Sequence, residues 1–275
     1  MTTQTSEVHG EHGGAVALAL SGGAARAAGH VGVLCALADA GVPIAGVVGT
    51  SAGAFVGALF ASGRYSADEL EEVARGLRWT DVLRPALSMR GFWTSEQVGT
   101  ALRRLIGGLR FSDLRRPFAA VACDLRTGEQ VLLQEGDVCC AVQASCSLPV
   151  FFTPTIVGDR VLVDGGAVSQ LPVLAARAQF PGSPIVGVDV NYRATETARL
   201  SNMVSVGVQV VSLFARQNAA RERAEADLMI DVDAAGVALY DLAKRDLMIV
   251  RGRAAAKAAL ANNPHIARTA KIPPR

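Results

Sequence analysis

Two short apolar runs with a helical pattern between them constrain the fold more than any other feature of this sequence. Residues 16–20 and 44–48 are built of valine, leucine, isoleucine, alanine and a single glycine, and each run leads into a glycine-containing turn. Between them, apolar residues recur at helical spacing over residues 27–40 until Gly41 and Pro43 stop the pattern. Two parallel strands joined by one right-handed crossover helix end at the same edge of a sheet. The two glycine-containing turns are therefore expected to lie side by side.

The rest of the chain continues the alternation of strands and helices. Ser66 and Glu69 have capping-box spacing and predict a helix start. The predicted helices are residues 66–76, 94–106, 138–145, 204–226 and 239–260, and the predicted strands are residues 118–123, 130–133, 161–163, 184–190 and 228–232. A largely parallel central sheet in an α/β fold follows. The 275 residues, half of them hydrophobic, suffice for one domain, expected at residues 14–264 between mobile tails at 1–13 and 265–275.

Composition excludes several classes of protein. A net charge of +2 without a basic run gives no sign of a surface that binds nucleic acid. The five cysteines lack C-x-x-C spacing and clustered histidines, which predicts a reducing compartment and no metal. The amino terminus lacks a basic start followed by an apolar run, so we expect a cytoplasmic protein. Residues 44–61 are apolar enough to resemble a membrane span, but their internal G-T-S-A-G favours a strand, a sharp turn and a helix.

The first candidate for chemistry is Ser51, within Gly49-Thr50-Ser51-Ala52-Gly53. The pentapeptide follows a buried strand and opens a helix, the context that a G-x-S-x-G nucleophile elbow requires. Glycines on both sides of the serine permit the strained turn, and the helix amino terminus favours developing negative charge. The alternative is a structural Gly-Ser turn at the start of a helix of small residues.

The second candidate is the glycine-rich loop after the first strand, with the sequence Gly22-Gly23-Ala24-Ala25-Arg26. Neighbouring strands lie about 5 Å apart, so its N–H groups can face an oxyanion that forms beside Ser51. The alternative is a loop that cradles the phosphates of a dinucleotide. The G-x-G-x-x-G spacing fails at Ala24 and Ala27, and the second strand lacks the acidic residue that would hold a ribose.

The third candidate is the base that would activate Ser51. His9, His12 and His265 lie in the two tails, and His30 takes an interior position in the first helix, where a structural role is more common. Asp164 follows the strand at residues 161–163 and precedes two glycines that permit close approach of another backbone. An aspartate before glycines is by default a turn residue, so this signal is weak without the other two.

Together these pieces resemble the patatin-like phospholipase family. The resemblance rests on the loop at residues 20–26 (LSGGAAR), the elbow at 49–53 (GTSAG) and the turn at 164–166 (DGG). Residues 144–154 (ASCSLPVFFTP) are similar to the A-S-x-x-x-P-x-x-F-x-P stretch of the family. Residues 124–129 (DLRTGE) are similar to a segment of its bacterial members.

The resemblance extends over residues 15–190 and implies a three-layer α/β/α fold. It implies lipid acyl-ester hydrolysis by a Ser-Asp dyad, without histidine, metal or cofactor. The implied site residues are Ser51 and Asp164 as the catalytic pair, Gly22, Gly23, Ala24 and Arg26 in the oxyanion hole, and Gly49, Gly53, Gly165 and Gly166 in the elbow and the dyad turn.

The implied reaction passes through an acyl-enzyme on Ser51 that water then cleaves. Because a carboxylate of ordinary pKa is a weak base for an alcohol, burial is expected to raise the pKa of Asp164, with Arg26 opposing this. Ala24 and Ala27 depart from the family, whose members often have glycine there. Ala24 weakens the oxyanion hole only if its position needs positive φ.

The partners follow from the implied substrate, a lipid or another acyl ester. Phe92 and Trp93 offer an anchor for peripheral membrane contact or a piece of core, and the helix at residues 204–226 could face lipid, a second subunit or the core. An acyltransferase or a general esterase would use the same acyl-enzyme. A lipid-binding regulator, in which the altered loop no longer supports catalysis, is the alternative from another class.

Overall fold

A single sheet of eight strands runs through the part of the chain that the structure describes. The computed structural model describes residues 14–86, 88, 90–194, 201–264 and 266. The strands are β1 (Val16–Leu20), β2 (Ile44–Thr50), β3 (Phe118–Asp124), β4 (Gln130–Leu133), β5 (Thr155–Val157), β6 (Arg160–Asp164), β7 (Ile185–Tyr192) and β8 (Leu228–Asp233). Their order in the sheet is β5-β6-β3-β2-β1-β7-β8, with β4 paired to β3.

The middle of the sheet is parallel and one side of it is antiparallel. β3, β2, β1, β7 and β8 pair in parallel, whereas β4 and β6 both run antiparallel to β3, and β5 runs antiparallel to β6. The predicted βαβ unit and the predicted pairing of residues 118–123 with 130–133 are therefore confirmed.

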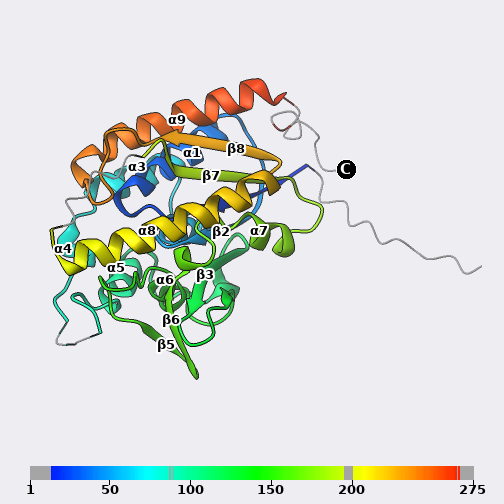
Figure 1. Cartoon of the computed structure of the whole chain (residues 1–275). Helices are drawn as coiled ribbons and strands as arrows, with labels where there is room; N and C mark the ends of the chain where they lie inside the picture. Colours follow the sequence, from blue (N-terminus) through cyan, green and yellow to red (C-terminus); the bar gives the residue numbers. More distant parts are fainter. Residues whose placement is uncertain (1–13, 87, 89, 195–200, 265, 267–275) are drawn as a thin grey trace, which may run out of the picture.

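Helices cover both faces of the sheet (Figure 1). The α-helices are α1 (Ala28–Asp39), α2 (Ala52–Ala61), α3 (Ala67–Gly76), α4 (Trp79–Val82), α5 (Glu96–Ile106), α6 (Val138–Ser145), α7 (Val173–Gln179), α8 (Met203–Glu222) and α9 (Arg245–Asn262). Short 3₁₀ turns are η1 (Ala24–Ala27), η2 (Phe111–Asp113), η3 (Gly165–Ala167), η4 (Arg223–Glu225) and η5 (Leu242–Lys244). The capping box of Ser66 and Glu69 forms at the start of α3, as predicted.

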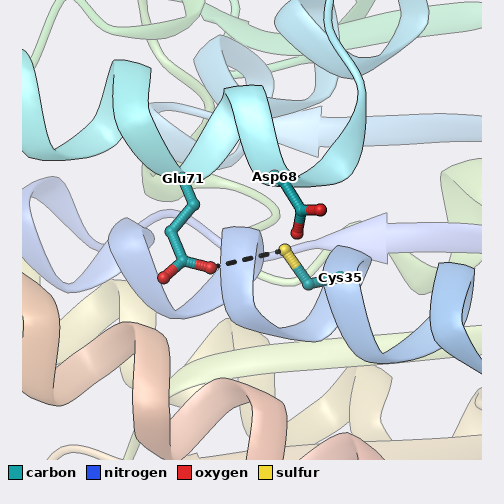
Figure 2. Close-up of side chains that lie close together, drawn as sticks. All are labelled: Cys35, Asp68 and Glu71. Carbon is teal, nitrogen blue, oxygen red and sulfur yellow. Dashed lines mark hydrogen bonds between the residues drawn. The ribbon is translucent and has the colours of Figure 1, made fainter.

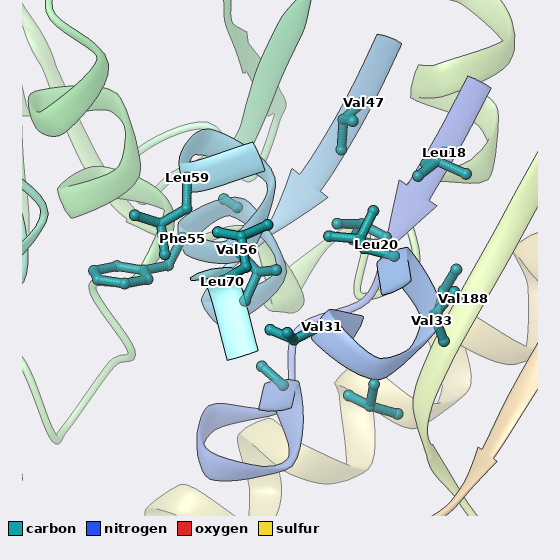
Figure 3. Close-up of a cluster of buried hydrophobic side chains, with 14 of the residues drawn as sticks. Leu18, Leu20, Val31, Val33, Val47, Phe55, Val56, Leu59, Leu70 and Val188 are labelled. Atoms are coloured by element: carbon teal, nitrogen blue, oxygen red, sulfur yellow. The ribbon is translucent and has the colours of Figure 1, made fainter. Parts of the chain in front are cut away.

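The core has two parts because successive residues of a strand face opposite sides of the sheet. On one side, Leu18 and Leu20 pack in a cluster with residues of α1, α2 and α3 (Figure 3). Residues of α9 belong to the same cluster. On the other side, Ala17 and Ala19 pack in a cluster with residues of α7 and with Ala219 of α8. The structure is thus the three-layer α/β/α fold predicted from the resemblance.

Several boundaries differ from the sequence-based prediction. β5, α4 and α7 were not predicted, and all three are short. The helix predicted at residues 239–260 begins at Arg245 instead, because the preceding segment turns back toward the glycine-rich loop. The Leu239 carbonyl accepts the Ala25 N–H at 3.0 Å, and the Val237 carbonyl accepts Arg26 Nε at 3.0 Å.

Two further predictions concern the tails and the apolar segment at residues 44–61. The predicted tails, residues 1–13 and 265–275, lie outside the described residues except for Ile266. Residues 44–61 form β2, a turn and α2, as favoured from the sequence. In the described residues, no helix has both the length and the hydropathy to cross a membrane.

Candidate active site

Ser51 occupies a sharp turn between β2 and α2. Its backbone has φ 54° and ψ −127°, in the region that L-residues rarely adopt. A Cβ on Gly53 would lie 2.4 Å from the Ser21 carbonyl oxygen, and a Cβ on Gly49 would lie 2.6 Å from the Ala54 nitrogen. The turn can therefore close on β1 and on α2 only with glycine at both positions. Ser51 projects from the sheet edge, as an elbow nucleophile must.

The backbone and hydroxyl of Ser51 both have hydrogen bonds. The Ser51 N–H donates to Ser145 Oγ at 2.8 Å, and Ser145 Oγ in turn donates to the Val121 carbonyl at 2.6 Å. The Ser51 hydroxyl donates to Asp164 Oδ2 at 2.5 Å. The structure thus brings Ser51 and Asp164 together although 113 positions separate them in the sequence.

Asp164 reaches Ser51 because β6 runs antiparallel to β3. Thr50 pairs with Val121 on one side of β3, and Asp164 pairs with Ala122 on its other side. A Cβ on Gly165 would lie 2.3 Å from the Val121 carbonyl oxygen, so only glycine permits the turn after Asp164 to pass so close to β3. The Gly166 N–H donates to Asp164 Oδ1 at 2.8 Å and orients the carboxylate.

The environment of Asp164 makes it a better base than an ordinary aspartate. Its side chain is buried, and burial raises its pKa from 3.8 to about 6, while the hydrogen bonds from Ser51 and Gly166 lower it. The expected rise is confirmed, and Arg26 is not among its causes. A pKa near neutrality increases the basicity of the carboxylate while leaving it mostly ionised at pH 7.

The glycine-rich loop lies beside the elbow, where β1 and β2 end. The Gly22 N–H donates to the Gln170 carbonyl at 3.0 Å, and the Ala25 N–H donates to the Leu239 carbonyl. Within the described residues, the N–H groups of Gly23 and Ala24 have no hydrogen-bond partner. Of the loop donors predicted for an oxyanion hole, these two have N–H groups available for a ligand.

Arg26 supports this loop from within the protein. Its side chain is only 2% exposed; Nε donates to the Val237 carbonyl, and Nη1 donates to Asn191 Oδ1 at 3.2 Å. The Asn191 amide donates to the Gly22 carbonyl at 2.8 Å. The guanidinium is thus linked through Asn191 to the backbone that carries Gly23 and Ala24, and this contact positions the loop.

His30 does not take part in the dyad. Its Nε2 donates to the Ser21 carbonyl at 2.8 Å, and burial lowers its pKa to about 4, although that hydrogen bond raises it. The ring is therefore neutral and directed at the backbone of the first turn. His9, His12 and His265 lie outside the described residues.

Two pockets of different polarity meet at Ser51. The first, of about 170 Å³, is lined almost entirely by apolar side chains, among them Val31, Phe55, Leu59 and Leu148. The second, of about 330 Å³ and here called the polar pocket, also contains Asp164. Its lining combines apolar residues such as Val211 and Leu239 with the polar residues Gln170, Asp189, Asn191, Arg193, Arg216 and Arg223. Ser51 therefore lies where the more apolar and the more polar pocket join.

Comparisons with known proteins agree with this geometry. The family model described as "Patatin-like phospholipase" matches residues 18–177, more than half of the chain. The chain belongs to the patatin-like phospholipase family. Residues 18–177 include the glycine-rich loop, the elbow at Ser51 and the turn at Asp164.

Curated relatives of this patatin-like chain are mostly longer than it is. An NTE family protein of Mycobacterium tuberculosis is 36% identical over 187 residues, which cover 67% of this chain and 49% of that protein. Human patatin-like phospholipase domain-containing protein 6 is 35% identical over 188 residues, which cover 65% of this chain and 13% of that protein. The chain thus spans about half, or less, of the length of these relatives.

A solved structure shares the patatin-like fold. VipD from Legionella pneumophila aligns with a TM-score of 0.63 over 90% of this chain and 67% of that chain, at 14% sequence identity. A likeness at this identity concerns the fold alone.

The patatin-like chain departs from its family at Ala24, and the structure shows what this position requires. Ala24 has φ 45°, a backbone conformation that suits glycine and strains alanine. Ala27, the other departure, has φ −60°, a backbone conformation that L-residues adopt without strain. Of these two departures, only Ala24 has a strained backbone.

Two residues near the dyad were not predicted to act there. Ser145 Oγ accepts the Ser51 N–H. Cys146 lies beside Ser51, and burial raises the pKa of its thiol well above the usual value of a cysteine. Both belong to the A-S-x-x-x-P stretch, so the motif pointed to this segment of the sequence but did not predict its contacts with Ser51. Asp124, in the other motif, is a turn residue whose carboxylate accepts the Arg126 N–H at 2.9 Å.

One group of potential metal ligands lies apart from the site. Cys35 of α1 faces Asp68 and Glu71 of α3, with ligand atoms within 4.8 Å of one another (Figure 2). The Cys35 thiol donates to the Ala67 carbonyl, burial raises its pKa to about 11, and Glu71 forms an ion pair with Arg253 at 3.0 Å. These contacts connect α1, α3 and α9, and we assign no metal to them.

Proposed function

We propose that this protein hydrolyses lipid acyl esters through an acyl-enzyme on Ser51, with Asp164 as the base. The observation that carries the proposal is the 2.5 Å hydrogen bond from Ser51 Oγ to the buried Asp164 carboxylate, at the junction of an apolar and a polar pocket. Membership of the patatin-like phospholipase family supports it.

In the first half of the reaction, Asp164 accepts the hydroxyl proton as Ser51 Oγ bonds to the acyl carbon. The carbonyl oxygen becomes an oxyanion that the N–H groups of Gly23 and Ala24 are placed to stabilise. The Ala52 N–H, the first of α2, has no hydrogen-bond partner in the described residues and is a further donor. The carbon–oxygen bond to the leaving alcohol then breaks, and Asp164 returns its proton to that alcohol.

In the second half, water attacks the acyl-enzyme. Asp164 accepts a proton from water as the new carbon–oxygen bond forms, and returns it to Ser51 Oγ as the carboxylic acid leaves. The Ser51 proton leaves with the alcohol and a proton from water restores the Ser51 hydroxyl, so the pair ends in its starting protonation state without an outside oxidant. An alcohol in place of water would give acyl transfer by the same steps.

The two pockets suggest how a lipid lies in the site. The acyl chain fits the apolar pocket beside Phe55 and Leu59, where burial of each CH₂ contributes about 0.8 kcal/mol. The polar remainder of the lipid fits the pocket lined by Arg193 and Arg216. The ester bond between them then lies at Ser51.

The test is hydrolysis of p-nitrophenyl esters of short and long acyl chains, and of phosphatidylcholine, by the wild type and two variants. Ser51→Ala removes the nucleophile and should reduce kcat to background, a loss on the order of a millionfold. Asp164→Asn removes the base and should lower kcat by about 10²- to 10⁴-fold. Asp124→Asn is the matched control, since it neutralises another buried aspartate near β6 without a contact to Ser51.

A fluorophosphonate that labels activated serines separates the hydrolase from a lipid-binding regulator. Labelling of the wild type, and its loss in Ser51→Ala, supports the proposal. A folded wild type that is inert on every ester and is not labelled would make the regulator the better description. Full activity in folded Asp164→Asn would place the base elsewhere. Glycerol added as an acceptor would reveal acyl transfer as an ester product.

A further inference from the structure

We propose that the outer face of α8 docks on an anionic lipid surface and holds the Ser51 cleft beside it. The proposal rests on the lipid acyl-hydrolase function proposed above, because such an enzyme must meet its substrate at a lipid surface. The outer face has five exposed apolar residues, here called the α8 stripe: Met203, Val206, Val210, Leu213 and Phe214.

The stripe is continuous along the helix. With about 100° between successive residues of an α-helix, these five positions fall within an arc of about 100°. Met203 is 90% exposed and Phe214 is 56% exposed. The stripe contains five of the thirteen exposed large apolar side chains in the described part of the chain. Figure 1 shows α8 lying along the outside of the molecule in yellow.

The opposite face of α8 lines the active-site cleft. Val211, Ser212, Ala215 and Ala219 line the polar pocket that contains Ser51. A helix with its side chains is about 10 Å thick, so a lipid surface on the stripe would lie about one helix diameter from the cleft. None of the five stripe residues lines either pocket at Ser51. The stripe can therefore be altered without changing the walls of the site.

The carboxyl-terminal end of α8 is fixed to the turn that follows Asp164. The Asn218 amide donates to the Ala167 carbonyl at 2.8 Å. The buried Glu222 carboxylate accepts the Ser169 hydroxyl at 2.5 Å and the Leu174 N–H at 3.0 Å. These bonds set the position of the stripe relative to the catalytic pair.

Charge favours an anionic lipid surface over a second copy of this chain. Residues 203–221 contain no aspartate or glutamate. Arg221 is exposed, lines neither pocket at Ser51, and has no ion-pair partner in the described residues. At about 100° per residue it falls within the arc of the stripe. An apolar helix face that carries an arginine and no acidic residue suits the interface of an anionic membrane. A second α8 stripe would offer this arginine no carboxylate.

The test measures flotation with vesicles of phosphatidylcholine, alone or mixed with phosphatidylglycerol, in a Ser51→Ala background that cannot consume lipid. The stripe variant carries Val206→Ser, Val210→Ser and Phe214→Ser and should bind at least about tenfold more weakly. The charge variant carries Arg221→Glu and should bind at least about fivefold more weakly to phosphatidylglycerol vesicles only.

The matched control removes exposed apolar side chains from other elements. Ile156→Ser on β5, Leu174→Ser on α7 and Val250→Ser on α9 should together leave vesicle binding within about twofold. With Ser51 intact, the stripe variant should cleave a soluble short-chain ester within about twofold of the wild-type rate. Its cleavage of vesicle phospholipid should fall about tenfold.

Three outcomes would overturn the docking proposal. They are unchanged vesicle binding by the stripe variant, an equal loss in the control variant, and a wild-type dimer that becomes monomeric in the stripe variant while vesicle binding persists. Failure of the hydrolase proposal is distinguishable, because it would appear as a wild type inert on soluble esters. Vesicle flotation in the Ser51→Ala background does not depend on that activity.

Discussion

The elbow at Ser51 and the glycine-rich loop at Ala24 lie side by side, and both place a non-glycine residue at positive φ. At the elbow, the strained residue is held through its own atoms, because Ser145 accepts its N–H and Asp164 accepts its hydroxyl. In the loop, the N–H of Ala24 has no partner in the described residues, and Asn191 and Leu239 hold its neighbours instead.

The difference lies in what the strain positions. At Ser51 it positions the hydroxyl of the proposed nucleophile, so the strained residue itself carries the proposed chemistry. At Ala24 it directs a backbone N–H, and the methyl group contributes nothing to that task. The elbow therefore requires serine at its strained position, whereas glycine could replace Ala24 in the loop without loss of the N–H group.

The largest expected effect concerns Asp164, the proposed base that contacts the elbow. Because the folded-state pKa of Asp164 is about 6, kcat/KM should fall tenfold per unit below pH 6, or about a hundredfold at pH 4. A pH–rate profile of the soluble-ester reaction measures this. A profile flat down to pH 5 would contradict a raised pKa of Asp164.

The same raised pKa affects stability. Protonated Asp164 stabilises the fold fully below its unfolded pKa of about 4, and this contribution is lost as pH rises through about 6. Asp164→Asn should therefore raise the free energy of unfolding by about 2 to 3 kcal/mol at pH 8 and by much less at pH 4. Urea unfolding at the two pH values tests the difference, with Asp124→Asn as the control.

The next variant removes the hydrogen bond that supports the elbow backbone. Ser145→Ala leaves the Ser51 N–H and the Val121 carbonyl without this partner, which should cost about 1 to 3 kcal/mol of stability. The loss of orientation should lower kcat/KM by about tenfold or more. Ser62→Ala, which removes a buried hydroxyl at the other end of α2, should leave kcat/KM unchanged.

A further variant removes the equivalent hydrogen bonds that support the glycine-rich loop. Asn191→Ala loses the bonds to the Gly22 carbonyl and to Arg26, so the N–H groups of the loop should lose their fixed direction. We expect kcat to fall about tenfold and KM to change little, since an oxyanion contact acts mainly in the transition state. Asn263→Ala removes a comparable amide bond at the end of α9 and serves as the control. Equal effects of both variants on kcat would contradict a role for the loop.

The smallest effect tests the strain at Ala24 itself. Ala24→Gly should raise the free energy of unfolding by about 1 kcal/mol, since glycine relieves positive φ at this position. Ala27→Gly should lower it by about 0.5 to 1 kcal/mol, because φ there is −60° and glycine only adds flexibility to the unfolded chain. Thermal unfolding of both variants compares the two departures directly, and a loss of stability in both would show that Ala24 is not strained.

Much of this site could be predicted because its signals are local. A turn such as that at Ser51 must be flanked by glycine, and the packing that requires Gly49 and Gly53 is visible in the sequence as G-x-S-x-G. The raised pKa of Asp164 also followed from one requirement, that a base for an alcohol be buried. The largely parallel sheet of an α/β fold followed from the alternation of apolar runs with helical patterns, whereas its three layers were implied by the family resemblance.

What could not be predicted depends on contacts between distant segments. Ser145 meets the Ser51 N–H only because α6 lies beside the elbow, and no spacing in the sequence reports that contact. The late start of α9 has the same cause, because the carbonyls of Val237 and Leu239 accept hydrogen bonds from the glycine-rich loop. The outward face of α8 was left open between lipid, subunit and core for this reason.

The pairing of β2 and β6 on the two sides of β3 has a consequence for insertions and deletions. Ser51 and Asp164 meet only while Thr50 pairs with Val121 and Ala122 pairs with Asp164. One residue inserted between Val121 and Ala122 would shift one partner by about 3.3 Å and turn its side chain to the other face of the sheet. Chain length should therefore be invariant within β3, yet free to vary at Gly128 in the β3–β4 turn, where nothing lies within 4 Å of an added Cβ.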